Sequence, residues 1–414
     1  MTGTASVAVV GGGIVGLCTA FHLRRAGLDV TVTEPNEPAA GASSGNAGSI
    51  SPGAVAPVAY PGMLRDVPRM LTDPNGPLRI TPAGALAGAS WLMRFALASR
   101  PDAVRRSAAG IAPLLATTLA AHRELAAAIG ASDLLEATGQ LQVYPDRETY
   151  GKDAFGWELR RRHGVEFYEL RREELLQYEP AIGPAYGFGV FLPESGMVTA
   201  PGGYGTALAA ALATEGTRFE RDEAIGLEED GGRIAAVIGR RGRYPCRAAI
   251  VCAGAWSAKL LERIGYDIPL INQRGYHLQF ADPGVAPRRI VSAADRKIFI
   301  TPMQEGLRVA GTVDIAPLAS RPDMRRAHIL AEGARSVFPD LHTSHASEWS
   351  GERPCLPDSL PVMGRAARHE NLWFNFGHGH LGLTMSAASG RAVVRAMETG
   401  DETPLAPFAA ARFG

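Results

Sequence analysis

The sequence lacks an excess of charge of either sign, since its 414 residues include 42 Lys and Arg and 42 Asp and Glu. A broad nucleic-acid-binding surface normally leaves a basic surplus, so the balance argues against a nucleic-acid partner. Long hydrophobic runs are also missing. The longest lie at 83–93 and 111–121, well short of the ~20 residues that span a bilayer. We therefore expect no transmembrane segment and a cytoplasmic location, and peripheral membrane contact stays open.

Cysteine is scarce, and its spacing excludes the common metal motifs. The four residues are Cys18, Cys246, Cys252 and Cys355, and they form neither a CxxC pair nor a Cys/His cluster with zinc spacing. The N-terminus shows neither a basic segment nor the apolar run of a signal peptide. We therefore expect free thiols in a reducing compartment and no metal site.

Glycine, in contrast, is abundant at 48 residues, and the first of these glycines form a nucleotide-binding pattern. A β-branched apolar run at 6–10 precedes Gly11, Gly13 and Gly16, which open a segment with helical spacing. A second strand-like run follows and ends at Glu34. In such a unit the glycines allow a tight turn, close approach of a pyrophosphate and close helix packing, while the acid accepts hydrogen bonds from a ribose. The pattern predicts a dinucleotide site.

The start of this helix and the segment after Glu34 extend the predicted site. Amides at the helix N-terminus, including those of Ile14 and Val15, are suited to bind phosphate. No arginine lies beside Glu34, which argues against a 2′-phosphate, but the motif does not separate FAD from NAD. Small residues at 41–52 suit a long cofactor that lies against backbone, and the candidates there are Ser43, Ser44, Asn46, Ala47, Gly48 and Ser49.

The remaining patterns indicate an α/β protein with two interleaved domains. A buried strand at 248–252 ends at Ala253 and Gly254, as a second edge of a nucleotide site would. Helical spacing at 111–129 and alternation at 274–280 indicate further helices and strands. We predict a Rossmann-like cofactor-binding domain from 1–60, 195–265 and 345–414. An inserted mixed-sheet α+β substrate-binding domain would comprise 61–194 and 266–344.

Arg353 is the most specific candidate near the C-terminus. It lies in a stretch at 349–364 whose three prolines should fix the backbone. A fixed guanidinium can grip a carboxylate with two hydrogen bonds. An internal ion pair with Glu352 or Asp358 explains the pattern equally well, and the residues alone leave both interpretations open.

A second glycine-rich stretch at 375–390 precedes a helix of small residues. The helix N-terminus can stabilise negative charge on a bound group. His378 and His380 lie in this turn, and their surroundings favour packing over catalysis. We nevertheless keep His380 as a candidate of the substrate site.

Several stretches together resemble the glycine oxidase/D-amino-acid oxidase flavoprotein family, and most of all its bacterial D-amino-acid dehydrogenase branch. They are VAVVGGGIVGLCTAFHLRRAG, SSGNAGSISPG, AIVCAGAWS, QRGYHLQF, WSGERPCLPDSLPVMG and GHGHLGLTMSAASG. The resemblance implies a D-amino-acid oxidase-like fold and FAD, which we expect to be non-covalent because Cys355 is not at the position where some relatives attach flavin. It also implies that Arg353 binds a substrate carboxylate and that Tyr276 and His277 help to form the pocket. The flavin would meet Gly379, Leu381, Gly382, Leu383 and Thr384.

The function that follows is oxidation of a D-amino acid, or of a cyclic D-imino acid such as D-proline or D-hydroxyproline, by hydride transfer to the flavin. The acceptor of the electrons stays open between O₂ and a quinone of the respiratory chain. A sarcosine- or glycine-type oxidase on the same fold is the nearest alternative. An NAD-dependent dehydrogenase and a flavoprotein without turnover are the others.

Overall fold

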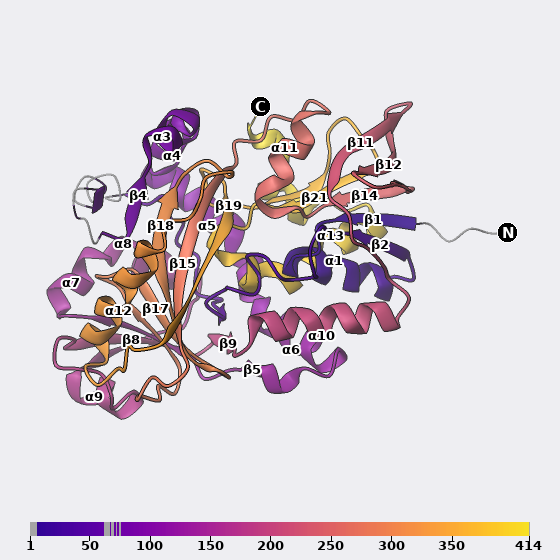
Figure 1. Cartoon of the computed structure of the whole chain (residues 1–414). Helices are drawn as coiled ribbons and strands as arrows, with labels where there is room; N and C mark the ends of the chain where they lie inside the picture. Colours follow the sequence, from indigo (N-terminus) through magenta and orange to yellow (C-terminus); the bar gives the residue numbers. More distant parts are fainter. Residues whose placement is uncertain (1–5, 62–66, 68–69, 72, 74–75, 414) are drawn as a thin grey trace.

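The cofactor-side half of the computed structural model contains a six-stranded sheet (Figure 1). The structure describes residues 6–61, 67, 70–71, 73 and 76–413. The strand order is β10 (Arg218–Glu220), β2 (Asp29–Thr33), β1 (Ser6–Val10), β14 (Ala248–Val251), β21 (Leu372–Phe376) and β20 (Val362–Arg365). All neighbours are parallel except β20, which pairs antiparallel with β21. Its apolar strands are buried, as expected for a sheet covered on both faces.

Helices cover one face of this sheet, and a small hairpin sheet covers the other. α1 (Ile14–Arg25) packs on α13 (Gly382–Thr399) and on α10 (Pro201–Thr214). The first two approach so closely that a Cβ at Gly390 would lie 2.9 Å from the backbone nitrogen of Thr19. On the opposite face lie β11 (Ala224–Asp230), β12 (Arg233–Gly239), β13 (Arg243–Pro245) and α11 (Ser257–Glu262).

The second half contains a nine-stranded mixed sheet. Its order is β19 (Ala346–Cys355), β15 (Ile271–Phe280), β18 (Gly306–Ile315), β17 (Ile298–Met303), β16 (Ile290–Ala293), β6 (Gln140–Tyr144), β8 (Phe188–Leu192) and β7 (Tyr168–Arg171), with β4 (Leu78–Ile80) beside β18. α12 (Arg325–Val337) packs on one face, and its apolar residues join the core of the sheet. The shorter helices on this side are α7 (Arg147–Lys152), α8 (Ala154–Arg162) and α9 (Arg172–Tyr178).

Further helices and a three-stranded sheet connect the two halves. The sheet pairs β3 (Ser49–Ile50) and β5 (Leu135–Glu136) with β9 (Gly196–Val198). The helices are α3 (Pro82–Ala87), α4 (Ala89–Ala98), α5 (Pro101–Ala116) and α6 (Thr118–Ala128). In Figure 1, α3 and α4 lie at the upper left, beside β4 and β18. Within the described residues no helix combines the length and apolarity needed to cross a bilayer.

The predicted fold class is confirmed, with two local corrections. β19 falls inside the stretch 345–414 that was predicted for the cofactor domain, yet it pairs along its whole length with β15 of the large sheet. The helix predicted at 111–129 is broken at Thr117, where the hydroxyls of Thr117 and Thr118 bond to carbonyls three residues back. Such bonds compete with the helix ladder. The rest of the division into two domains stays a prediction.

Candidate active site

Three parallel strands, β1, β2 and β14, end at one edge of the six-stranded sheet, and the backbone is packed tightly there. Gly11 has φ +106°, and a Cβ on it would lie 2.6 Å from the carbonyl oxygen of Cys252. A Cβ on Gly16 would lie 1.9 Å from the carbonyl oxygen of Gly11. Only glycine fits at either position, so the turn keeps its backbone exposed to whatever binds there.

The N-terminus of α1 is open at this edge. Its N-cap is Gly13, which has no side chain to cap the helix, and its first turn contains no acidic residue. The amide of Ile14 donates to the Ser43 hydroxyl at 2.9 Å. Among the described residues, no hydrogen-bond partner is found for the amides of Val15 and Gly16. Free amides at a helix N-terminus form a site for a phosphate group.

Glu34 and the end of β14 flank this helix. One Glu34 carboxylate oxygen accepts from the amide of Gly12 at 2.8 Å, and the other accepts from that of Asn36 at 3.1 Å. On the far side, the backbone of Ala253 lies against Gly11, while a Cβ on Gly254 would meet open space. The sequence-predicted candidates Gly11, Gly13, Ile14, Val15, Gly16, Glu34, Ser43, Ala253 and Gly254 thus gather at one strand edge.

The small-residue segment runs from this edge toward the large sheet and is tied to α13. The side-chain carbonyl oxygen of Asn46 accepts a hydrogen bond from the amide of Gly48 at 2.8 Å, which forms a local turn. The Thr384 hydroxyl, in the first turn of α13, donates to the carbonyl oxygen of Ser49 at 2.9 Å. Ser44 differs from its neighbours, because its hydroxyl bonds back to the carbonyl of Ala40 at 3.0 Å.

The start of α13 is held from behind by a buried histidine. His122 Nε2 donates to the carbonyl oxygen of Leu383 at 2.8 Å, and Nδ1 lies 3.2 Å from the Tyr204 hydroxyl. Burial lowers the pKa of His122 to about 4, so the ring is neutral at ordinary pH. The glycine turn before the helix, with Gly379 at φ +56°, is therefore joined to a helix end whose backbone is held in place.

Arg353 lies on β19, opposite Gln273 of β15 in the antiparallel ladder. Its guanidinium covers Gly275, where a Cβ would come within 2.4 Å of the Arg353 Cζ. A ten-residue ladder, and not the nearby prolines, holds this position. The side chain is half-buried, and burial lowers its pKa from the ordinary value, but arginine stays charged.

The two internal partners that the sequence left open for Arg353 are both occupied elsewhere. Glu352 accepts from Arg274 at 2.8 Å on the opposite face of the sheet, and Asp358 accepts from Arg412 at 2.8 Å. Within the described residues, Arg353 has neither an ion pair nor a hydrogen bond. A guanidinium that is half-buried and unpaired calls for an anionic partner from outside the chain.

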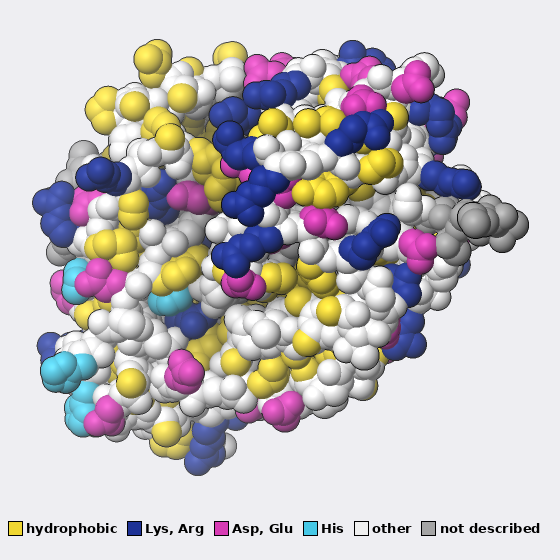
Figure 2. Space-filling model, turned by 45° about the vertical axis from the view of Figure 1, so that its right-hand side comes forward, with side chains coloured by type: hydrophobic (Ala, Val, Ile, Leu, Met, Phe, Trp, Pro, Cys, Tyr) yellow, Lys and Arg dark blue, Asp and Glu magenta, His cyan; other side chains and the backbone are white. Residues whose placement is uncertain are grey.

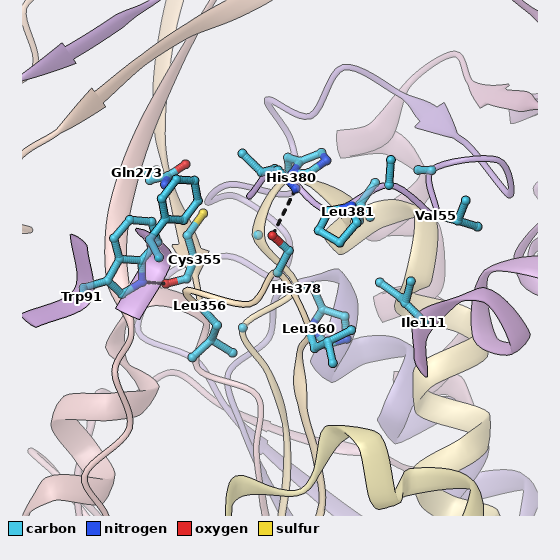
Figure 3. A pocket seen from close by; sticks show the side chains of 18 residues that line it. Val55, Trp91, Ile111, Gln273, Cys355, Leu356, Leu360, His378, His380 and Leu381 are labelled. Atoms are coloured by element: carbon cyan, nitrogen blue, oxygen red, sulfur yellow. Dashed lines mark hydrogen bonds between the residues drawn. The ribbon is translucent and has the colours of Figure 1, made fainter. Parts of the chain in front are cut away.

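An apolar cavity opens beside the end of β19 (Figure 3). Cys355 lines it, whereas Arg353, two positions earlier on the same strand, is not among its lining residues. Gln273, the ladder partner of Arg353, lines the cavity, and so does His380 from the turn before α13. His380 itself is exposed. The walls are mainly apolar and include Val55, Trp91, Phe95, Ile111, Leu356, Leu360 and Leu381. His378 also lines the cavity but packs on Ser389, as the sequence predicted.

Two predicted pocket residues are elsewhere. The prediction for Tyr276 is wrong, because its side chain is on the α12 face of the sheet, where its hydroxyl donates to Asp314 at 2.7 Å. His277 is on the same face as Arg353 but does not line the cavity. Its Nδ1 donates to the carbonyl oxygen of Gly45 at 3.0 Å, and its ring stacks on Trp349 at 5.0 Å.

Comparison with known proteins agrees with this geometry. Residues 6–396 match the family described as FAD dependent oxidoreductase. The chain belongs to the FAD-dependent oxidoreductase family. It is 39% identical to a D-amino-acid oxidase of Bradyrhizobium diazoefficiens, over 98% of each chain. It is 30% identical to a D-amino acid dehydrogenase of Rhizobium rhizogenes, over 99% of this chain and 100% of that one. Glycine oxidase from Geobacillus kaustophilus has the same fold, with a TM-score of 0.76, 23% identity and 99% coverage of both chains.

The site of this FAD-dependent oxidoreductase fits its cofactor. The bare N-terminus of α1 and the glycine cradle suit a pyrophosphate. The Glu34 carboxylate is placed to accept from ribose hydroxyls, as in other dinucleotide sites. The segment 46–49 and the start of α13, joined by the bond from the Thr384 hydroxyl to the Ser49 carbonyl, would offer a second backbone surface to the ring end of the cofactor. No group of three possible metal ligands is found in the described part of the chain.

Some residues of the site were not singled out from the sequence. Gln273 and Trp91 line the cavity, Trp349 packs on Gly45, and Arg308 and Thr301 contact the small-residue segment. The sequence alternates in β fashion at 297–302 and 307–312, which is typical of the strands that carry the last two. It did not indicate which sheet face would meet the cofactor segment.

Proposed function

We propose that this FAD-dependent oxidoreductase oxidises a D-amino acid, or a cyclic D-imino acid of the D-proline or D-hydroxyproline kind. The unpaired guanidinium of Arg353 carries the proposal, because it fits a carboxylate that the chain itself does not provide. The apolar cavity beside it fits a side chain of the same substrate. The D-amino-acid oxidase and dehydrogenase names of the relatives support this choice.

Bound FAD supplies an acceptor for the hydride that leaves the substrate Cα. The chain's own residues orient the substrate. Arg353 would hold the carboxylate with two charge-assisted hydrogen bonds, and the apolar walls would keep water from the reacting carbon. Among the described residues no carboxylate lines the cavity, so the substrate would lose its ammonium proton to water before oxidation. The resulting imine is then hydrolysed by water, or is kept as a cyclic imine.

A sarcosine- or glycine-type oxidase remains the second candidate, since that class uses the same fold. The apolar walls of the cavity favour the first proposal, because glycine has no side chain to place there. Comparing kcat/KM for D-amino acids, D-proline, D-hydroxyproline, sarcosine and glycine decides between the two.

Replacing Arg353 tests the proposed carboxylate contact. Two charge-assisted bonds are worth about 3–5 kcal/mol together, so Arg353→Met should lower kcat/KM on the order of 10²–10³-fold. Arg353→Lys should recover part of the loss, because a lysine keeps the charge without the fork. Arg365→Ala is the matched control, since this arginine forms a half-exposed ion pair with Glu402. A loss below tenfold in Arg353→Met removes the residue from the pocket.

We also propose that FAD is held without a covalent bond. Cys355 lines the cavity, but burial raises the pKa of its thiol to about 12, which keeps it protonated and unreactive. Acid precipitation should therefore release all of the flavin into the supernatant. Yellow colour in the washed pellet would contradict this.

We further propose that the electron acceptor is a membrane quinone and that α3 and α4 contact the lipid surface. Leu86, Met93 and Leu97 on these helices are 84%, 64% and 49% exposed. The stretch 81–101 contains two arginines, Arg94 and Arg100, and no acidic residue. Hydrophobic side chains gather at this end of the molecule in Figure 2. An apolar face with positive charge fits an anionic lipid surface. Comparing O₂ with a quinone analogue as acceptor tests the first part.

A further inference from the structure

The segment 44–48, which the proposed function puts beside the ring end of FAD, is held by side chains of the large sheet. Arg308 Nη1 donates to the carbonyl oxygens of Ser44 at 3.0 Å and Asn46 at 2.6 Å. His277 Nδ1 donates a hydrogen bond to the carbonyl oxygen of Gly45. These two side chains come from β18 and β15, neighbouring strands of the sheet in Figure 1.

The next two carbonyls are held as well. Thr301, on β17, donates from its hydroxyl to the carbonyl oxygen of Ala47 at 2.8 Å, and the amide of Val198 donates to that of Gly48 at 2.7 Å. Thr301 is fully buried. Five consecutive carbonyl groups of one segment, at 44–48, are therefore bonded to groups outside it, and side chains of the large sheet hold four of them.

This arrangement determines where the amides of the segment point. In a trans peptide the C=O and the following N–H lie on opposite sides. Carbonyls directed at the sheet therefore turn the following amides away from it. The amide of Asn46 donates to the carbonyl oxygen of Ser43, just before the segment, and that of Gly48 donates to the Asn46 side chain. In the part of the chain that the structure describes, those of Gly45 and Ala47 have no hydrogen-bond partner.

Arg308 is the central member of this group. Its Nε donates to the Gln279 side chain at 2.9 Å, so all of its bonds go to neutral acceptors. No acidic side chain forms an ion pair with it among the described residues. A half-buried guanidinium with three neutral partners costs desolvation energy, and its hydrogen bonds go only to the segment and the neighbouring strand.

We propose that Arg308, His277 and Thr301 are positioning residues that hold the segment 44–48 by its carbonyls and so direct the amides of Gly45 and Ala47 at the flavin. The sheet that forms the substrate cavity would thereby also set the environment of the cofactor. This rests on the placement of the segment beside FAD, and not on which substrate is oxidised.

The test uses two substitutions. Arg308→Met removes two hydrogen bonds to the segment, and Thr301→Val removes one. Arg308→Lys keeps the positive charge but loses the planar guanidinium that donates to two carbonyls at once. Arg289→Met is the matched control, because this half-buried arginine of the same half donates to a single carbonyl, that of Thr138, at 3.0 Å. Two quantities are measured: the dissociation constant of FAD with its visible spectrum, and hydrogen exchange of the amides at 44–48.

We expect Arg308→Met to weaken FAD about tenfold or more, to shift its absorption bands and to speed exchange at 44–48. Thr301→Val should weaken FAD about three- to tenfold, Arg308→Lys should fall between the two, and Arg289→Met should match the wild type. Faster exchange with an unchanged FAD constant and spectrum overturns the link to the flavin. An unchanged hydrogen-exchange rate at 44–48 in Arg308→Met overturns the proposal that this side chain holds the segment. Failure of D-amino acid turnover affects neither readout, since both use the cofactor alone.

Discussion

At the scale of single residues, the site depends on positions where any side chain would collide with the rest of the chain. Gly45 is the clearest case outside the nucleotide turn. A Cβ there would lie 2.1 Å from the indole of Trp349, which itself stacks on His277. The flatness of this contact lets the segment 44–48 lie directly on the sheet.

Gly45→Ala should therefore displace the segment from Trp349. We expect a loss of stability of about 1–3 kcal/mol, as for other overpacked sites, and weaker FAD binding. Chemical unfolding and FAD titration measure the two effects. Gly41→Ala is the control four residues earlier, where the position is exposed and a Cβ would meet nothing within 4 Å. Equal behaviour of the two variants would mean that the packing on Trp349 is unimportant.

Residue patterns predicted the glycine turn and Glu34 because their spacing encodes a local structure, strand–turn–helix–strand, within about thirty positions. They did not predict which of Tyr276 and His277 faces the cavity side of the sheet. Neighbouring residues on a strand point to opposite faces, so at most one of them shares a face with Arg353. That choice depends on α12 covering one face of the sheet, which no local pattern reveals.

At the scale of elements, β19 is the part that sequence reasoning described least well. The three prolines at 349–364 predicted a fixed backbone but no strand, whereas β19 runs in continuous register with β15 from Ala346 to Cys355. Pairing with a strand some 75 positions away is set by tertiary contacts and not by propensity. The consequence is functional, since the ladder places Arg353 over Gly275 and beside Gln273.

The exposed apolar face of α3 and α4 supports an element-scale prediction. Wild-type protein should sediment with vesicles that contain phosphatidylglycerol and less with phosphatidylcholine alone. Leu86→Ser combined with Met93→Ser should abolish most of this binding, because the two side chains are the most exposed apolar groups of the face. Tyr168→Ser, which removes an exposed apolar side chain on β7, should have no effect. Binding that survives the double substitution would exclude this face.

At the scale of the whole molecule, the chain crosses between its two sheets several times, as the interleaved sequence patterns indicated. Each half has its own hydrophobic core. Histidines are buried at several places in the molecule: His122 on α6, His277 on β15 and His378 before α13. His22 on α1 is half-buried. Sequence reasoning recognised them as packing residues only in part, because burial of a histidine follows from which helices meet.

These histidines predict how stability depends on pH. Burial lowers the pKa of four of them to about 3 or 4, below the ordinary value of 6.5: His22, His122, His277 and His378. Below about pH 6.5 the unfolded chain binds protons that the folded chain refuses, so stability falls as the pH drops. Each histidine contributes a slope of up to about 1.4 kcal/mol per pH unit.

Urea unfolding of the FAD-saturated protein between about pH 7.5 and 5 measures this slope, in a range above most carboxylate titration. His122→Gln should reduce the slope by the share of one histidine. The control is His163→Gln, on the half-exposed end of α8. A free energy of unfolding that is constant over this range would contradict the prediction.

The central claim is that an unpaired arginine beside an apolar cavity receives the carboxylate of an oxidisable D-amino acid. The most direct measurement is anaerobic mixing of the oxidised holoenzyme with single amino acids while the visible flavin band is followed. The account predicts bleaching by apolar D-amino acids or D-proline, and none by their L-enantiomers or by the corresponding amines without a carboxylate. Bleaching by such an amine as fast as by the amino acid, or no bleaching by any D-amino or D-imino acid, would contradict it.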